Sequence, residues 1–308
     1  MIKLVLEAFL LAVALDILFG EPLPALHPVV WMGSLIGYLD RHSPRKLKRL
    51  YGIAMAFSCI ILTVAVGYGI TMVLYRVSPF LSLLAMAYLL KSTFSFSFLW
   101  RTSGDIHADL KAGRLEAARS KLPALVGRDV SRLDSGQMAS CVIESLGESF
   151  VDGIFSPLAY FTIFGLPGAL AYRAINTLDS MVGYKDEKHR QTGWASARID
   201  DLANFIPARL AVLLIAAVSG HPARAIRTAM RDGRNAPSIN SGYPMSAFAG
   251  ALGARLEKLK FYVLGEGLKP CGVEDIPRAI RLNKLMAAVV VAVILAVLWL
   301  TPLPLIGG

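Results

Sequence analysis

Three acidic residues recur at a helical spacing near the middle of the chain. Glu144, Glu148 and Asp152 follow one another at intervals of four residues, in a segment whose composition predicts a helix from about residue 137. All three carboxylates should project from one helix face, although like charges at this spacing repel one another. Oxygen ligands on a shared face suit Mg²⁺ that carries a phosphate substrate, because this ion keeps several waters and uses few carboxylates. The alternative is a solvated acidic face that is paired with nearby Arg or Lys.

A second polar block begins at residue 176, directly after an apolar segment, and reads NTLDSMVGYKDEKHR. Ionisable residues that flank or enter apolar runs are costly there, so they are candidates for function. Within this block and the residues up to 209, the oxygen donors are Asn176, Asp179, Asp186, Glu187, Asp200, Asp201 and Asn204. The cations, which suit phosphate or carboxylate groups, are Arg173, Lys185, Lys188, Arg190, Arg198 and Arg209. The alternative is an ordinary charged loop in solvent.

Asp16, His27 and Lys91 are further candidates, because each lies within or beside an apolar run. For His27 alone, a structural histidine is the favoured reading.

The composition indicates a membrane protein with several spans. Hydrophobic residues make up 55% of the 308 positions, and the mean hydropathy of +0.54 exceeds what a soluble core needs. The net charge of +10 is typical of cytoplasmic loops and of contact with anionic lipid. No helix-turn-helix pattern accompanies this charge, which disfavours nucleic-acid binding. The three cysteines are far apart and indicate neither a zinc site nor a disulfide framework.

About four segments are predicted to span the membrane as helices. Residues 50–75 carry no charge and are long enough to cross a hydrocarbon core of roughly 30 Å. Residues 79–100, interrupted only by Lys91, should return as a second span, and residues 285–300 form a third. The run 4–19 fits a signal peptide poorly, so we interpret it as a retained first membrane helix. The chain is thus predicted to be all-α and polytopic, with one integral membrane domain over residues 1–308.

Two shorter apolar runs, 154–172 and 202–219, pose a question of topology. The stretches 101–150, 173–201 and 220–284 are all rich in Lys and Arg, so all three are predicted to be cytoplasmic. Neither run is long enough to cross twice, and each should therefore be re-entrant or buried in protein. The break GLPG at 165–168 suits such a hairpin, because Gly and Pro interrupt a straight helix. The alternative is that both runs cross once.

Several familiar motifs are absent from the sequence. It contains no GxxxxGK[ST], no complete dinucleotide fingerprint, no GxSxG and no HExxH. A nucleotide, if one is used, must be bound in another way.

Six blocks in order resemble the CobD/CbiB family of adenosylcobinamide-phosphate synthases. They are DILFGEPLPALHPVVWMG (16–33), LVGRDVSRLD (125–134), ESLGESFVDGIFSPL (144–158), AYRAINTLDSMVGYKDEKHR (171–190), SARIDDLANFIPARL (196–210) and NSGYPMSAFAGALGARL (240–256). The resemblance implies a ligase of cobalamin (vitamin B12) biosynthesis in the inner, cytoplasmic cell membrane, with its active site facing the cytoplasm. It would join the free carboxylate of adenosylcobyric acid, a corrinoid, to (R)-1-amino-2-propanol O-phosphate or ethanolamine phosphate, with ATP and Mg²⁺. Other late cobalamin-pathway membrane enzymes are implied partners, and nucleic acid is not.

The resemblance also suggests roles for the polar residues. Amide formation needs an activated carboxylate, most simply an acyl phosphate made from ATP. The implied metal ligands are Glu144, Glu148, Asp152, Asp179, Asp200 and Asp201. Arg128 or Arg209 would hold the phosphate of the amino alcohol, and one carboxylate, from among Glu144, Glu148, Asp152 and Asp179, would act as general base. The remaining substrate and phosphate contacts are assigned to His27, Asn176, Thr177, Ser180, Lys185, Lys188, Arg190, Arg198 and Asn204, with Lys185 also counted as catalytic.

Two other classes stay open at this point. A membrane transporter also has broken membrane segments near polar residues, but the sequence contains no inverted repeat. A non-catalytic regulator of the related AmpE-like type would need surface rather than carboxylates in four separate blocks.

Overall fold

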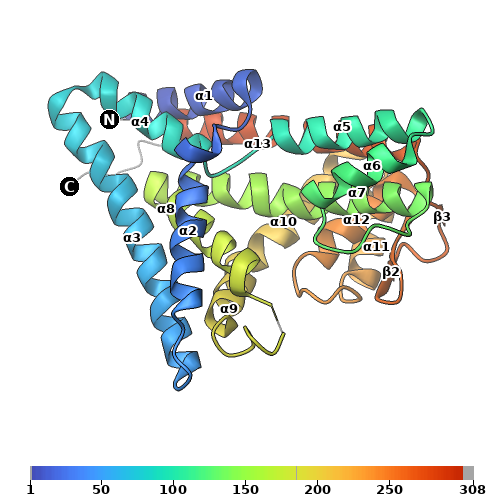
Figure 1. Cartoon of the computed structure of the whole chain (residues 1–308). Helices are drawn as coiled ribbons and strands as arrows, with labels where there is room; N and C mark the ends of the chain where they lie inside the picture. Colours follow the sequence, from blue (N-terminus) through green and yellow to red (C-terminus); the bar gives the residue numbers. More distant parts are fainter. Residues whose placement is uncertain (1, 185, 301–308) are drawn as a thin grey trace. The chain divides into compact units, whose positions relative to one another are not determined.

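The chain is almost entirely helical, as predicted. The structure is a computed structural model that describes residues 2–184 and 186–300. Its residues form two compact units, each made from separate stretches of sequence: the first holds 1–95, 156–203 and 292–308, and the second holds 96–155 and 204–291. Each unit is described by itself, and Figure 1 labels the elements.

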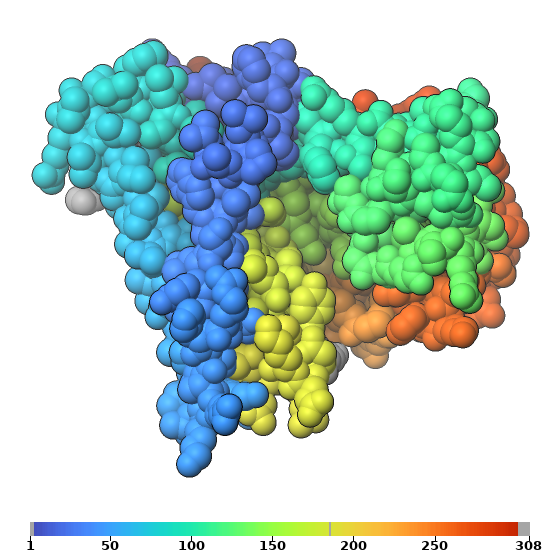
Figure 2. Space-filling view, viewed as in Figure 1, coloured from blue at the N-terminus to red at the C-terminus, as the bar shows by residue number. Residues whose placement is uncertain are grey.

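The first unit is built from six helices and a short 3-10 turn in the part of the chain that the structure describes. They are α1 (Ile2–Phe19), η1 (Pro24–Leu26), α2 (Pro28–Arg41), α3 (Lys48–Val77), α4 (Pro79–Lys91), α8 (Ser156–Val182) and α9 (Trp194–Ala203). The core between α2, α3, α8 and α9 consists of Ile36, Met55, Ala56, Cys59, Leu178, Val182 and Ala195. Figure 2 shows the α2–α3 hairpin in blue, with the yellow segment around α9 packed along it. This packing places the polar block that begins at residue 176 beside the tip of the hairpin.

The second unit combines helices with a small sheet that the sequence did not predict. Its helical elements are α5 (Ser97–Lys111), α6 (Leu115–Lys121), η2 (Leu122–Ala124), α7 (Ser135–Phe150), the π-helix η3 (Val151–Phe155), α10 (Phe205–Val218), α11 (Pro222–Asp232) and α12 (Gly242–Leu252). The strands are β1 (Ala254–Lys258), β2 (Tyr262–Leu264) and β3 (Lys269–Pro270). β1 lies in the middle, antiparallel to β2 and parallel to β3, and it also packs against α7.

The helix α13 (Asp275–Leu300) contributes to both units, with residues up to 291 in the second and later ones in the first. Both α3 and α13 are long and apolar enough to cross a membrane, which confirms two of the predicted spans. Among the described residues, three helical stretches meet this test, or four if α9 and α10 form one broken span. The prediction of a polytopic membrane protein with about four spans is therefore confirmed.

The predicted span 79–100 is wrong. The helix α4 ends at Lys91 after only 13 residues, and the polar helix α5 begins at Ser97. The hydroxyl groups of Ser92 and Thr93 donate to the carbonyls of Leu89 and Leu90, and such local bonds compete with continuation of the helix. At about 1.5 Å per residue, α4 is near 20 Å long, which is too short to cross a roughly 30 Å core alone.

The predicted first membrane helix forms as α1, but it is not among the three helices suited to cross a membrane. It carries Lys3, Glu7 and Asp16, and the side chain of Asp16 is fully buried in an ion pair with Lys91. The helix therefore contributes a charged group to the interior of the first unit.

The helix α8 doubles back on itself at the predicted GLPG break. Gly165 has φ 66° and ψ −157°, a conformation that is open almost only to glycine. The rings of Tyr160 and Tyr172 stack with their centroids 5.3 Å apart, whereas twelve residues of straight helix would separate them by about 18 Å. The run 154–172 thus contains a helical hairpin, and its insertion into the membrane stays a prediction.

The second short run, 202–219, is divided at Asn204, between α9 and α10. The apolar helix α10 has 14 residues, about 21 Å at 1.5 Å per residue, and is again shorter than the hydrocarbon core. Whether this run is re-entrant or part of a broken span stays open.

Candidate functional site

In the second unit, Glu144 is the centre of a buried polar cluster on α7. A capping box starts the helix, because Asp134 accepts from the backbone of Gln137 and Gln137 accepts from the backbone of Asp134. The face that this helix turns toward β1 and β2 then carries Glu144, whose residue surface is only 4% exposed. A buried carboxylate of this kind needs partners.

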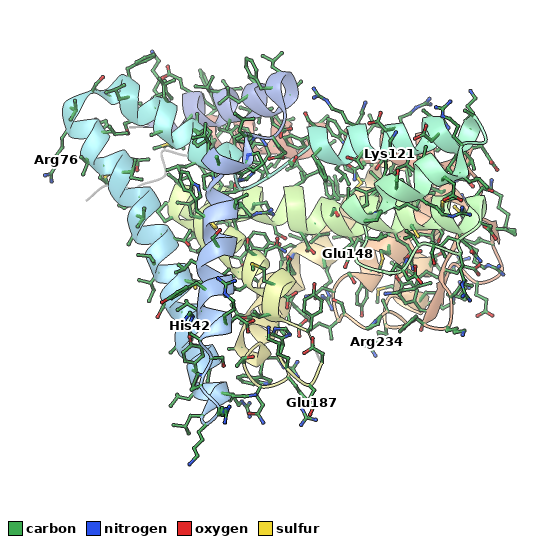
Figure 3. The ribbon with its side chains drawn as sticks, in the orientation of Figure 1. His42, Arg76, Lys121, Glu148, Glu187 and Arg234 are labelled. Carbon is green, nitrogen blue, oxygen red and sulfur yellow. The ribbon has the colours of Figure 1, made fainter. Side chains whose placement is uncertain are left out.

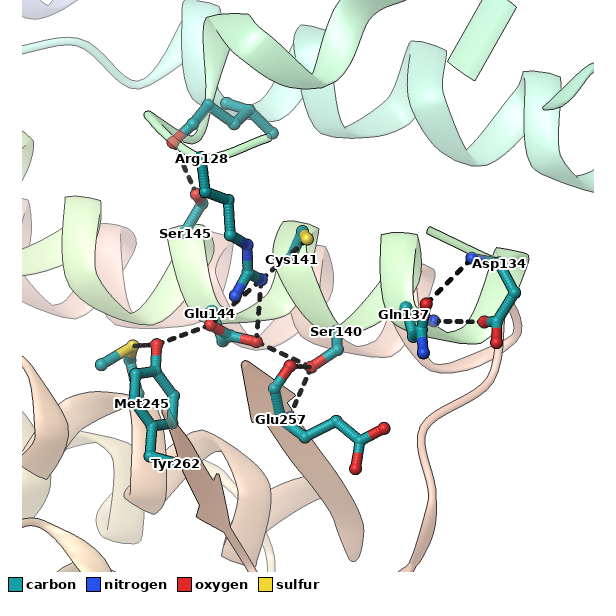
Figure 4. Close-up of polar contacts among 11 residues, drawn as sticks. Arg128, Asp134, Gln137, Ser140, Cys141, Glu144, Ser145, Met245, Glu257 and Tyr262 are labelled. Carbon is teal, nitrogen blue, oxygen red and sulfur yellow. Dashed lines mark hydrogen bonds and ion pairs between the residues drawn. The ribbon is translucent and has the colours of Figure 1, made fainter. Parts of the chain in front are cut away.

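Three side chains donate to the Glu144 carboxylate (Figure 4). The Ser140 hydroxyl lies 2.8 Å from Oε1, the Tyr262 hydroxyl lies 2.7 Å from Oε2, and Nη2 of Arg128 lies 3.2 Å and 3.3 Å from the two oxygens. The same arginine nitrogen lies 2.7 Å from Sγ of Cys141. Ser140 also accepts from the backbone N–H of Glu257 at 2.8 Å, which ties the cluster to β1.

The protonation of these partners follows from their surroundings. Burial, reinforced by the nearby carboxylates of Glu144 and Glu148, raises the pKa of Tyr262, so its hydroxyl keeps its proton and donates. Burial disfavours the charge on Arg128, but Glu144 and Cys141 outweigh it, and the pKa of Arg128 lies above its ordinary value. The cluster is therefore a buried ion pair with two supporting hydrogen bonds.

Glu148 and Asp152 lie in different surroundings from Glu144. The side chain of Glu148 is exposed on α7 (Figure 3) and accepts a hydrogen bond from Ser241. The α-helix ends at Phe150 and the π-helix begins at Val151, so the four-residue α-helical interval that predicted a common face no longer applies at the half-buried Asp152. The alternative of a solvated acidic face is wrong for Glu144, which is buried.

In the first unit, the end of α8 and the start of α9 bring acidic residues together. Asp179 is half-buried beside the backbone of Gly183 and is close enough to Asp201 for their charges to repel. Asp200 is similarly close to the Tyr160 hydroxyl. Two carboxylates in mutual repulsion are a plausible cation site, since a divalent ion would relieve the repulsion.

Cations and amides surround this acidic pair. Asn176 accepts from Arg173 at 3.2 Å, and Arg198 lies 3.5 Å from Asp201. In the loop between α8 and α9, Nζ of Lys188 lies 2.6 Å from Oδ2 of Asp40. Arg190 is exposed, and Glu187 points away from the loop (Figure 3). Lys185 lies outside the described residues.

Four of the predicted substrate contacts already serve the protein itself. The hydroxyl groups of Thr177 and Ser180 donate to the carbonyls of Arg173 and Asn176 one turn earlier. Asn204 is buried at the amino end of α10. In the second unit, the guanidinium of Arg209 donates to Asn240 and to the carbonyls of Phe205 and Ile239, and it packs over the rings of Phe205 and Tyr243.

His27 belongs to a separate charged network in the first unit. Its Nδ1 accepts from the backbone N–H of Val29 at the start of α2, so its Nε2 carries the proton that is donated to Glu21 at 2.9 Å. Lys91, 2% exposed, lies 2.9 Å from Asp16 and 3.0 Å from Glu21. The structural reading of His27 fits this geometry, because the imidazole holds the loop between α1 and α2.

The comparisons with known proteins cover almost the whole chain. The model of the family described as "CobD/Cbib protein" matches residues 9–301. The chain belongs to the CobD/CbiB family. Its relatives include the "Probable cobalamin biosynthesis protein CobD" of Methanothermobacter thermautotrophicus, with 40% identity over 91% of this chain and 93% of the relative. They also include the "Cobalamin biosynthesis protein CobD" of Klebsiella pneumoniae, with 37% identity over 95% of this chain and 97% of the relative, and the "Cobalamin biosynthesis protein CbiB" of Salmonella typhi, with 35% identity over 94% and 96%. No solved structure matches the chain.

The predicted metal ligands of this CobD/CbiB chain do not form a ready-made cage. Within the described residues, no three His, Cys, Asp or Glu side chains lie together in a way that could hold a metal ion. A Mg²⁺ ion that arrives with a nucleotide needs only one or two carboxylates, and the Asp179–Asp201 pair meets that need. Glu144 suits it less, because its oxygens already accept from three protein donors.

Some residues of the site carry no signal in the sequence. Tyr262 donates to Glu144 across 118 positions, and it lies in a strand that the sequence did not predict. Asp40 holds Lys188 across 148 positions. Ser140 is different, since it precedes Glu144 by four residues, and a serine at this spacing on a buried helix face could have been noticed.

Proposed function

We propose that this protein is an adenosylcobinamide-phosphate synthase. The observation that carries the proposal is the family match over residues 9–301, together with relatives that are named cobalamin biosynthesis proteins. In the proposed reaction, ATP phosphorylates the free carboxylate of adenosylcobyric acid and leaves as ADP. The amine of aminopropanol phosphate or ethanolamine phosphate then attacks the acyl carbon, phosphate leaves, and a carboxylate accepts the proton.

Each unit would supply its own part of the chemistry. In the first unit, Asp179 and Asp201 are the best placed to hold Mg²⁺, which would neutralise charge on the nucleotide phosphates. The cations nearby, Lys188, Arg190 and Arg198, extend this positive environment, although Lys188 must first release Asp40. Because the side chains of Thr177 and Ser180 donate within their own helix, we assign them to holding the end of α8 in place.

In the second unit, Glu148 is the favoured proton acceptor among the carboxylates of α7. It is exposed to an incoming amine, and the Ser241 hydroxyl orients it. Glu144 is better suited to hold Arg128 in a fixed orientation, through the contacts at 3.2 and 3.3 Å. The raised pKa of Arg128 keeps this group cationic, as recognition of a substrate phosphate requires.

We further propose that the protein resides in the cytoplasmic membrane, with these residues on the cytoplasmic side. The support is the concentration of Lys and Arg in 101–150, 173–201 and 220–284, since positive loops are retained on that side.

A nutritional test addresses the function directly. A strain that lacks this protein should grow on cobinamide but not on cobyric acid, because only the step between them is missing. Growth on both compounds would refute the enzyme proposal and leave the regulator. Altered uptake of either compound, with synthase activity intact in lysate, would favour the transporter.

Variant enzymes test the assigned residues. Asp179→Asn and Glu148→Gln should each lower the rate of ATP-dependent amide formation by about 100-fold or more, with the fold retained. Glu187→Gln is the matched control in the same loop as the cations, because that side chain is exposed, and it should leave the rate unchanged. Full activity of Asp179→Asn and Glu148→Gln in folded protein would show that the assignment is wrong.

A further inference from the structure

A second, separate binding pocket lies within the second unit. It has a volume of about 220 Å³ and is lined at one side by Val218, Leu252, Leu282 and Leu285 and at the other by His221, Arg278 and Arg281. No acidic residue is among the residues that line it. One half of the lining is therefore apolar and the other half is cationic.

The pocket lies where two apolar helices end. The apolar helix α10 terminates at Val218, and the uncharged run of α13 begins at Leu285, directly after Lys284. Apolar side chains of a membrane protein mark the hydrocarbon layer, and the basic residues that flank them mark the headgroup layer. The pocket thus spans the boundary between these layers.

The cationic groups of the pocket divide into committed and uncommitted ones. Arg278 lies 2.6 Å from Asp275 and donates to the carbonyl of Leu252 at 3.0 Å, while Arg224 donates to the carbonyls of Gly250 and Ala251. These bonds cap the carboxyl end of α12 and neutralise its partial negative charge. Arg281 is exposed, and among the described residues no carboxylate forms an ion pair with it.

The amino end of α11 adds a further attraction for an anion. His221 precedes α11, an 11-residue helix that starts with Pro222 and has no side-chain cap at this end. The unpaired backbone N–H groups of a first turn favour negative charge. His221 therefore brings the positive end of a helix dipole to the pocket that Arg281 lines.

We propose that this pocket binds the headgroup of an anionic phospholipid, with the phosphate on Arg281 and His221 and the acyl chains along Leu282 and Leu285. A soluble phosphate compound would use the cations but would gain nothing from the apolar half. The inference is independent of the synthase proposal, since none of these residues is assigned to that reaction.

The test is lipid binding to the purified full-length protein in detergent, followed by native mass spectrometry. The probes are dioleoyl phosphatidylglycerol and dioleoyl phosphatidylcholine. The wild-type protein should prefer the anionic lipid, and Arg281→Ala should weaken its binding about five-fold, from the roughly 1 kcal/mol that one basic residue contributes at an anionic surface. Phosphatidylcholine binding should not change.

Matched variants separate the pocket from net charge. Arg227→Ala removes an exposed arginine of α11 that does not line the pocket, and it should leave the preference intact, as should Arg281→Lys. Equal losses in Arg281→Ala and Arg227→Ala, or equal binding of the two lipids by the wild-type protein, would overturn the proposal. Displacement of the anionic lipid by an equal concentration of inorganic phosphate would assign the pocket to a soluble anion instead.

Discussion

One terminal nitrogen of Arg128 bridges both carboxylate oxygens of Glu144, at 3.2 and 3.3 Å, although 16 positions separate the two residues. The pair is largely buried, with side chains that are 15% and 6% exposed. Arg128→Ala would leave Glu144 as an uncompensated charge, and we expect a loss of stability of about 3–5 kcal/mol.

The measurement is thermal or denaturant unfolding of the purified protein in detergent. The double variant Arg128→Ala with Glu144→Gln should be more stable than Arg128→Ala alone, because it removes the stranded charge. Arg132→Ala, at an exposed position four residues later, is the control and should change stability by less than about 0.5 kcal/mol. A strictly additive double variant would contradict a coupled pair.

Lys91 is a second buried cation whose removal can be predicted. It lies 2.9 Å from Asp16, and the two side chains are 2% and 0% exposed. Lys91→Met should destabilise the protein by about 3–5 kcal/mol, since Asp16 stays buried without a counterion. Adding Asp16→Asn should recover most of this loss. Lys111→Met, at the exposed end of α5, serves as the control, and equal effects of the two lysine variants would contradict the ion pair.

Gly165 should not tolerate a side chain. Its φ of 66° and ψ of −157° are strained for any other residue, so Gly165→Ala should cost roughly 1–3 kcal/mol and disturb the hairpin in α8. Gly104→Ala is the matched control, because that glycine is in the helix α5 with open space around it, and alanine should stabilise a helix there. The melting temperatures of the two variants should therefore move in opposite directions.

Glu21 predicts how stability depends on pH in acid. Burial alone would raise its pKa, but hydrogen bonds from His27, Ser95 and Lys91 outweigh it and lower the pKa to about 2. A carboxyl whose pKa is lower in the folded state stabilises the protein above its ordinary pKa, near 4.5, and this contribution disappears as the pH falls toward 2. Glu21→Gln should flatten the loss of melting temperature between these values. Above pH 6 the variant should show a constant deficit, and an unchanged acid profile would contradict the role of Glu21.

The sequence predicted the elements better than the contacts between them. The uncharged runs at 50–75 and 285–300 and the GLPG break each have a local cause, either length without charge or glycine in a helix, and the structure contains all three. The span 79–100 failed because hydropathy averages over Lys91, whereas the structure pairs this lysine with Asp16 and ends the helix beside it.

The partners of Glu144 could not be predicted for a different reason. The four-residue spacing identified a special helix face, but the spacing contains no information on the tyrosine that comes from β2, 118 positions later. The choice between a metal ligand and a buried ion pair depends on such distant residues. The prediction that Asp179 and Asp201 act on a metal is still untested, although the structure brings their charges together.

The short π-helix Val151–Phe155 has a consequence for how this chain can change in evolution. A π turn is equivalent to one residue inserted into an α-helix. Deleting a single residue between Phe150 and Ser156 would restore regular winding and rotate everything that follows by about 100°. Homologous chains should therefore tolerate substitution in this stretch far more readily than a change of length, so that the residue count between Glu148 and Gly165 becomes a constraint in its own right.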